Sequence, residues 1–191
     1  MRHRRFAFTL LELLVVMGII SLLIAMLMPS LSWARKSARR TACSSNLHQV
    51  AIGLTNYLGD SRGILPYVIP LTKRHGEEDD DDLLYSLRRY IDGKGVWICP
   101  DDDTGVAEAL GTSYDYWPGW IMWARELFRG DPGHAVARIV TKFYEFSPEK
   151  YPIMADAEGW HQPLDETGKN ASWWDGSVSS LRDWTNPRWR R

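Results

Sequence analysis

The stretch that decides the fold is Phe8-Thr9-Leu10-Leu11-Glu12, followed by an apolar run over residues 13–31. A helix needs about 20 mainly apolar residues to cross the hydrocarbon core of a bilayer, and this run has nearly that length. A cleaved secretory signal would have a shorter apolar core, of roughly 7 to 15 residues, closed by a small-x-small site. Here the run continues into a helix-like segment instead. We therefore predict a membrane-spanning helix over residues 8–32.

Glu12 is the unusual residue of this stretch. A carboxylate buried alone in a membrane helix costs on the order of 3 kcal/mol. Glu12 lies at the edge of the run, where water and lipid headgroups can solvate it. The other interpretation is that a partner of opposite charge meets it. The residues alone leave both interpretations open.

An arginine-rich leader, a small residue, Phe8-Thr9-Leu10-Leu11-Glu12 and a long apolar run stand here in that order. This order resembles the cleavage and methylation signature of type IV pilins and of type II secretion pseudopilins. The resemblance implies that a prepilin peptidase removes residues 1–7 by cutting between Ala7 and Phe8, and that Phe8 is then N-methylated. It implies that Glu12 pairs with the terminal amine of a neighbouring subunit, and that Pro29 is the helix-kinking proline found in many pilins.

Arginines flank the run on both sides, so the distribution of positive charge barely decides its orientation. The peptidase signature places the leader in the cytoplasm. The resemblance therefore implies a single-pass protein of the inner membrane, embedded in lipid before assembly. Residues 61–191 would then form a globular domain outside the cytoplasm.

Past Ser32 the apolar residues recur at spacings of three and four, which is typical of an amphipathic helix. They are Cys43, Leu47, Val50, Ala51, Leu54, Tyr57 and Leu58. We predict that the helix continues over residues 33–60, because Gly59-Asp60, Gly63 and Pro66 supply stop signals. The fold class we expect is α+β, with this long helix packed on a small antiparallel sheet as in pilins.

Short strands and helices are predicted beyond the long helix. Residues 96–99 and 151–155 are strand candidates, and residues 171–174 and 177–181 form a hairpin around a two-residue Asp175-Gly176 turn. A short helix is expected from Leu83. Another helix is expected over residues 117–128, with Trp117, Trp120 and Trp123 along it. Burial of these rings in the core explains the tryptophans better than stacking on sugars does.

The acidic residues Asp79, Asp80, Asp81 and Asp82 precede the helix expected from Leu83. Carboxylates are ligands for calcium, but the alternating ligand spacing and the glycine of a calcium loop are missing. A solvated loop that caps the helix is the simpler interpretation. We expect no cofactor, with calcium as the alternative.

Cys43-Ser44-Ser45-Asn46-Leu47, Cys99-Pro100 and Asp175-Gly176 resemble a pilin-like family described by a His-x9-Asp-Gly processing-associated motif. Thirteen residues separate His161 from Asp175, so the histidine does not fit that motif. Cys43 and Cys99 form either one bridge or two free, buried thiols. By the loop-entropy argument a bridge would add about 4 kcal/mol of stability.

No spacing typical of a zinc protease, a hydrolase or a nucleotide-binding loop occurs. Asp156, His161 and Asp175 would need to converge to bind a metal, and turn or surface roles are more common for such residues. The net charge of −1 does not favour nucleic-acid binding. We expect a structural filament subunit of a pilus or a secretion pseudopilus, with no enzymatic activity. The alternative is a membrane-tethered domain that binds calcium or a glycan and does not polymerise.

Overall fold

The computed structural model describes residues 9–68, 83–129, 133–161 and 168–181. The predicted processing residues Ala7 and Phe8 lie outside these ranges, as do the calcium candidates Asp79, Asp80, Asp81 and Asp82. The chain divides into two compact units, residues 1–38 and 39–191.

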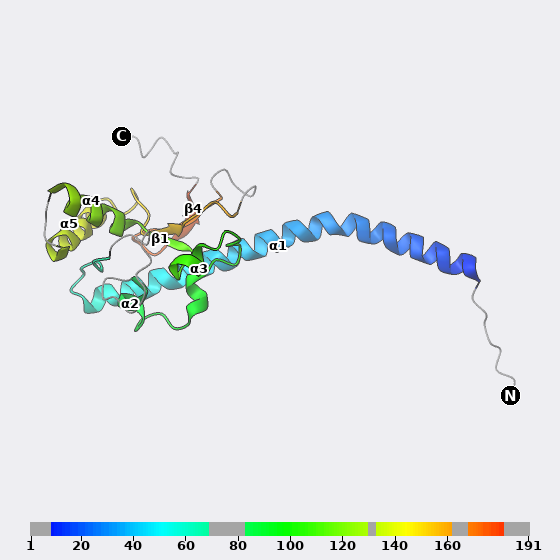
Figure 1. Cartoon of the computed structure of the whole chain (residues 1–191), viewed down its shortest axis with the longest axis horizontal. Coiled ribbons are helices and arrows are strands. Elements are labelled where there is room, and N and C mark those ends of the chain that lie inside the picture. Colours follow the sequence, from blue (N-terminus) through cyan, green and yellow to red (C-terminus); the bar gives the residue numbers. More distant parts are fainter. Residues whose placement is uncertain (1–8, 69–82, 130–132, 162–167, 182–191) are drawn as a thin grey trace, which may run out of the picture. The chain divides into compact units, whose positions relative to one another are not determined.

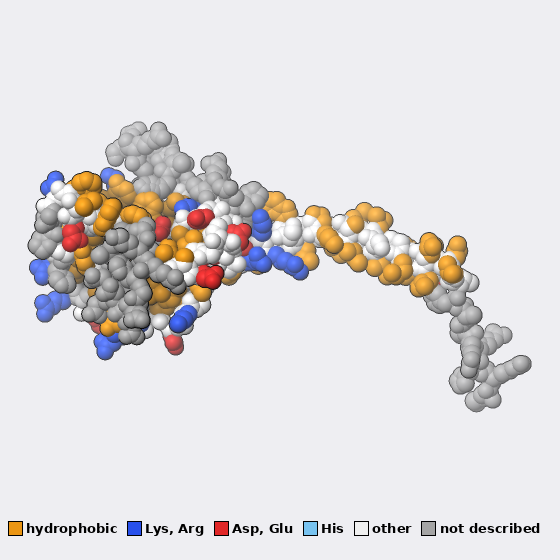
Figure 2. Space-filling view, viewed as in Figure 1, with side chains coloured by type: hydrophobic (Ala, Val, Ile, Leu, Met, Phe, Trp, Pro, Cys, Tyr) orange, Lys and Arg blue, Asp and Glu red, His pale blue; other side chains and the backbone are white. Residues whose placement is uncertain are grey.

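Helix α1 (Leu10–Asp60) is continuous and has Pro29 in its interior (Figure 1). Every side chain of α1 within the first unit is exposed, including the apolar ones. These side chains form the orange band along this part of the helix in Figure 2. Among the described residues, α1 alone is long and apolar enough to cross a membrane. Signal sequences near an N-terminus can have the same length and apolar composition.

Within the second unit, α1 buries one face. Cys43, Leu47, Val50, Ala51 and Leu54 are buried, which confirms the predicted amphipathic pattern. The helix ends where predicted. The Gly63 N–H donates to the Leu58 carbonyl oxygen at 2.8 Å, and the φ of Gly63 is 74°, in the left-handed region that glycine adopts without strain.

The sheet has four antiparallel strands in the order β1-β2-β3-β4. They are β1 (Tyr114–Tyr116), β2 (Met154–Asp156), β3 (Asn170–Ser172) and β4 (Val178–Ser180). Tyr114 pairs with Asp156, and Ser172 pairs with both Met154 and Val178. The long N-terminal helix and this small sheet confirm the predicted α+β fold.

The predicted hairpin is confirmed as β3 and β4, but its two-residue turn is wrong. The Gly176 N–H donates to the Trp173 carbonyl oxygen at 3.0 Å, and the Trp173 N–H donates to the Ser177 carbonyl oxygen at 2.9 Å. Gly176 has a φ of 80°. The connection is therefore a turn closed by a left-handed glycine, one of the common longer hairpin loops.

The strand predicted over residues 96–99 is also wrong. Residues Lys94–Trp97 form a 3-10 helix, η1, and only Ile98 is extended. Trp97 and Cys99 are buried while Ile98 is 42% exposed, so the alternation of apolar side chains is real. It arises from a segment that crosses the core without joining the sheet, which periodicity alone cannot distinguish from a strand.

Four α-helices complete the described part of the second unit. They are α2 (Leu83–Leu87), α3 (Val106–Leu110), α4 (Trp117–Arg129) and α5 (Gly133–Phe146). The helix expected over residues 117–128 is confirmed as α4. The helical spacing of Leu83, Leu87 and Ile91 predicts a helix that continues to Ile91, and α2 begins at Leu83 but already ends at Leu87. Helices α4 and α5 pack against each other. The core combines side chains from α1, α4, α5 and the first two strands, among them Leu47, Tyr114, Tyr116, Met122, Val136, Val140, Tyr144 and Met154.

Candidate functional site

The start of α1 is closed by reciprocal hydrogen bonds between Thr9 and Glu12. Glu12 Oε2 accepts from the Thr9 N–H at 2.9 Å and from the Thr9 hydroxyl at 2.8 Å. The Glu12 N–H donates to Thr9 Oγ1 at 3.2 Å. This is a capping box, which satisfies N–H groups that the first turn of a helix leaves unpaired. The Glu12 carboxylate therefore has a partner inside its own helix.

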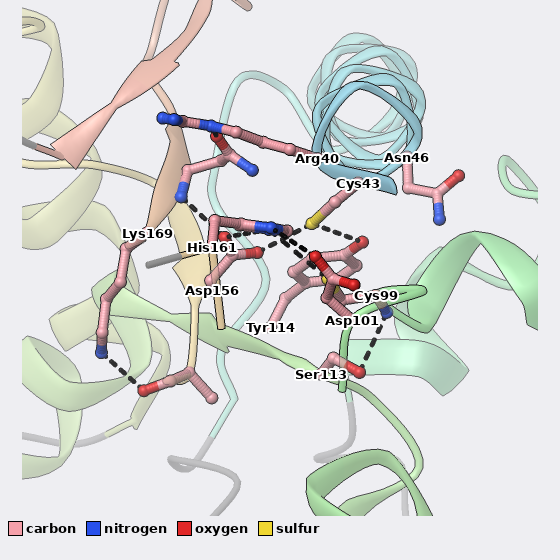
Figure 3. Close-up of polar contacts among 12 residues, drawn as sticks. Arg40, Cys43, Asn46, Cys99, Asp101, Ser113, Tyr114, Asp156, His161 and Lys169 are labelled. Carbon is pink, nitrogen blue, oxygen red and sulfur yellow. Dashed lines mark hydrogen bonds and ion pairs between the residues drawn. The ribbon is translucent and has the colours of Figure 1, made fainter. Parts of the chain in front are cut away.

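A second candidate site is buried in the unit of residues 39–191. Cys43, Cys99, Asp156 and His161 each offer one ligand atom, and these atoms all lie within 4.8 Å of one another (Figure 3). All four residues are buried. We call them the cysteine–histidine cluster.

Each member of the cluster comes from a different part of the fold. Cys43 lies on the buried face of α1, and Asp156 is the last residue of β2. Cys99 follows η1, and its N–H donates to the Ser113 hydroxyl at 3.0 Å. His161 lies in the turn after β2, where its N–H donates to the Gly168 carbonyl oxygen at 3.0 Å. Helix, sheet and two loops thus meet at one point.

The side chains of the cluster touch one another directly. The Cys43 thiol donates to Asp156 Oδ1 at 3.0 Å. His161 Nε2 lies 3.2 Å from Asp156 Oδ2 and 3.6 Å from Cys99 Sγ. The Tyr114 hydroxyl lies 3.5 Å from Cys43 Sγ. Sulfur, nitrogen and carboxylate oxygen therefore face a common centre.

Polar groups around the cluster hold its members in place. His161 Nδ1 lies 3.1 Å from Asp101 Oδ2, and Asp101 Oδ1 lies 3.2 Å from Arg39 Nη1. Asp156 Oδ2 accepts from the Asn170 N–H at 2.6 Å, across the pairing of β2 and β3. These contacts fix the orientation of the imidazole and of the carboxylate.

The surroundings set the charge of the cluster when no metal is bound. Burial alone would lower the pKa of His161, but the hydrogen bond and negative charge of Asp156 outweigh it and raise this pKa to about 10. A hydrogen bond with Cys99, together with burial, raises the pKa of the Cys43 thiol. A metal-free cluster at neutral pH therefore holds an imidazolium and a protonated Cys43.

The structure brings some of the predicted residues together and separates others. Cys43 and Cys99 meet as expected, and both are free thiols. Asp156 and His161 join them, so two of the three residues considered for a metal site meet, although turn or surface roles were the favoured interpretation. Asp175 stays outside, because its Oδ1 accepts from the Ser177 N–H at 2.9 Å within the hairpin loop.

Asn46, in the motif around Cys43, supports the cluster indirectly. Its side-chain amide donates to the Ile98 carbonyl oxygen at 3.0 Å and to the Gly95 carbonyl oxygen at 3.4 Å. Asn46 therefore ties the segment that carries Cys99 to α1, close to Cys43. The buried side chain of Leu47 anchors the same turn of the helix in the core.

Two of the three tryptophans of α4 line a hollow of about 800 Å³ on the second unit. Its wall includes Trp117, Trp120, Phe128, Phe143 and Tyr151. Trp117 and Trp120 are half-buried and Trp123 is 42% exposed, so the expectation of buried aromatics holds only in part.

Comparison with known protein families gives two matches. Residues 2–28 match the prokaryotic N-terminal methylation motif. Residues 32–80 match a family described as a protein of unknown function, DUF1559. The first match contains Ala7, Phe8, Glu12 and the start of α1, and the second contains Cys43 and Asn46. Comparisons with curated proteins and with solved structures give no match.

Proposed function

This chain is a type IV pilin- or pseudopilin-like protein with a prepilin-type signature, and from this premise we propose that it is a structural subunit of a filament. A prepilin peptidase of the inner membrane removes residues 1–7 and Phe8 is N-methylated. The subunit then joins other pilin-type subunits through the first part of α1. The filament is a type IV pilus or a type II secretion pseudopilus.

The methylation motif over residues 2–28 carries this proposal. The exposed apolar surface of α1 supports it, because such a surface must be covered by lipid or by neighbouring helices. Removal of the leader takes away Arg2, Arg4 and Arg5 and changes the formal net charge from −1 to −4.

Glu12 has one partner before assembly and a different one in the filament. In the single chain its carboxylate caps α1 through Thr9. In the filament it pairs with the methylated amine of Phe8 in a neighbouring subunit. The second pairing lies in apolar surroundings, where an uncompensated charge is costly, so a subunit without the carboxylate leaves an amine buried and unpaired.

Intact-mass and N-terminal analysis of the chain from its native membrane tests the processing step. We expect a mature chain that begins at methylated Phe8. A chain that still begins at Met1, in cells with an active prepilin peptidase, would refute the proposal. Cleavage near Ser32 would also refute it, because the product would be a secreted protein without the helix that assembles.

Three variants at the start of α1 test the assembly step. We expect Glu12→Ala and Glu12→Gln to abolish filaments, because both remove the charge. Thr9→Ala is the matched control, since it removes the two hydrogen bonds that the Thr9 hydroxyl makes in the cap and leaves the carboxylate, and it should still assemble. Carbonate extraction should show all three variants inserted in the membrane. Wild-type filament yield from Glu12→Gln would contradict the charge pairing.

The second candidate function is a membrane-tethered domain that binds a glycan without polymerising. The aromatic hollow beside α4 favours it, because tryptophan and tyrosine rings can stack on sugar faces. This function predicts that Glu12→Ala leaves ligand binding and cellular activity unchanged. It also predicts that Trp120→Ala removes both, whereas a filament subunit with the same change still assembles.

A further inference from the structure

We propose that Cys43, Cys99, Asp156 and His161 bind one zinc ion, and that this ion is a structural cross-link of the globular unit. The four residues lie on α1, after η1, at the end of β2 and in the turn that follows β2. No assignment of this kind follows from the methylation motif, which ends before the first of them.

The spacing of the donor atoms fits a tetrahedral zinc site. Zinc binds thiolate sulfur at about 2.3 Å and imidazole nitrogen or carboxylate oxygen at about 2.0 to 2.2 Å, so neighbouring ligand atoms stand about 3.3 to 3.8 Å apart. His161 Nε2 lies 3.6 Å from Cys99 Sγ and 3.2 Å from Asp156 Oδ2. The remaining pairs also lie within 4.8 Å. The donor atoms would close in on the ion by up to about 1 Å per pair to reach this spacing.

The contacts around the cluster are those that orient metal ligands. A histidine that binds zinc through one ring nitrogen usually donates the other N–H to a carboxylate or a carbonyl oxygen. His161 Nδ1 lies 3.1 Å from Asp101 Oδ2, so Asp101 holds the tautomer that turns the lone pair of Nε2 toward the sulfur atoms. The Asn170 N–H likewise fixes one oxygen of Asp156.

The donor set selects the kind of metal. Two sulfur atoms, one imidazole nitrogen and one carboxylate oxygen suit zinc, whereas calcium and magnesium take oxygen ligands. Two thiolates and a carboxylate bring three negative charges against two on the ion. Arg39 is already paired with Asp101, whereas Arg40 lies near the excess negative charge and donates to Asn170 Oδ1 at 3.2 Å.

The same donor set determines what the ion does. Four protein ligands complete a tetrahedron, so no position remains for water or substrate, and the site is of the structural type. The ion would tie α1 to β2 and to two loops at a point where all four ligands are buried. Binding therefore adds directly to the free energy of unfolding.

Two other states of the cluster compete with zinc. Without a metal, the imidazolium of His161 between Asp101 and Asp156 would hold the site together as an ion pair. In an oxidising compartment, an oxidant could take two electrons and two protons from Cys43 and Cys99 and join the two sulfur atoms in a disulfide. Only the zinc site needs both thiols reduced and deprotonated.

Metal analysis of the full-length chain, purified in detergent from its native membranes through a tag that binds no metal, tests the proposal. We expect about one zinc per chain. Exchange with cobalt should give thiolate charge-transfer bands and the intense visible bands of tetrahedral cobalt. Folded chain without stoichiometric metal, or with another metal in place of zinc, would overturn the proposal. A disulfide between Cys43 and Cys99 would also overturn the proposal. It would be detected if neither cysteine reacted with iodoacetamide under denaturing, non-reducing conditions.

Variants assign the ligands. Cys43→Ser, Cys99→Ser and His161→Asn should each lose the zinc, while His48→Gln, which replaces an exposed histidine of the same unit, should keep it. Asp101→Asn should keep the fold and weaken zinc binding about 10- to 100-fold, as is typical for a residue that orients a ligand. If a ligand variant is too unstable to isolate, the cobalt spectrum of the wild-type chain still decides between zinc and an ion pair. Full zinc content in folded His161→Asn would refute the assignment.

Discussion

Gly53 lies where α1 closely approaches the segment after α2. Replacing Gly53 by alanine shows how a gain in helix propensity and a loss from overpacking each change the stability of the fold. A Cβ atom at Gly53 would stand 2.3 Å from Ile91 Cγ1 and 2.8 Å from Ile91 Cδ1. Ile91 is only 8% exposed, so its side chain has little room to move away. At Gly59 in the same helix, a Cβ atom would meet nothing within 4 Å.

The two substitutions by alanine should therefore have different effects. Each gains up to about 1 kcal/mol of helix propensity. Gly53→Ala also costs about 1 to 3 kcal/mol of overpacking. We expect Gly53→Ala to be less stable than Gly59→Ala by about 1 to 3 kcal/mol, or about 2 to 12 °C in Tm for a unit of this size. Tryptophan fluorescence of the detergent-solubilised chain, which has ten tryptophans, measures both.

Ile91→Ala supplies the internal control, because it removes both atoms that the new Cβ would meet. In that background Gly53→Ala should recover its gain in propensity, which a double-mutant cycle reports as a favourable coupling energy. Equal stability of Gly53→Ala and Gly59→Ala, with no coupling to Ile91, would refute the argument from close packing.

Two further predictions concern α4 and β1. Gly119→Ala would place a Cβ 2.8 Å from the Val68 carbonyl oxygen. Because a backbone oxygen cannot rotate away as a side chain can, we expect the free energy of unfolding to fall by about 1 to 3 kcal/mol, measured as a lower urea midpoint. An unchanged midpoint would contradict the clash. Burial raises the pKa of Asp115 above its ordinary value of 3.8, with Lys169 opposing the shift in part. Asp115→Asn should therefore raise the urea midpoint at neutral pH, and this advantage should disappear as the pH falls through the raised pKa toward 3.8. An advantage that persists or grows in acid would contradict the assignment.

Local signals predicted the long helix and the hairpin. Their patterns depend on residues a few positions apart, such as Cys43 and Leu47 on one helix face, or Asp175 and Gly176 in one turn. Helix α5 carries the same kind of spacing in Val136, Val140 and Tyr144. The local signal for this helix is therefore present in the sequence, although the predicted elements do not include it.

The buried cluster could not be predicted in the same way. The sequence pattern around Cys99 predicts a strand, because alternation of apolar and polar residues does not reveal whether a segment has a strand partner. The distance of His161 from Asp175 along the chain says nothing of its true neighbours, because the fold places His161 beside Asp156 and Asp101. Which residues meet across the core depends on strand order and on the path of loops, and neither is encoded in local spacing.

The wide separation of the cluster residues along the chain has a consequence for biogenesis. Cys43 and Asp156 are 113 positions apart, and Cys99 and His161 are 62 positions apart. In the proposed topology, with residues 39–191 outside the cytoplasm, Cys43 would cross the membrane before its partners, and both thiols would stay accessible to oxidants and alkylating reagents until the cluster forms. The reactivity of Cys43 would then report whether a newly exported chain has finished folding, and a chain cut short before His161 would remain reactive.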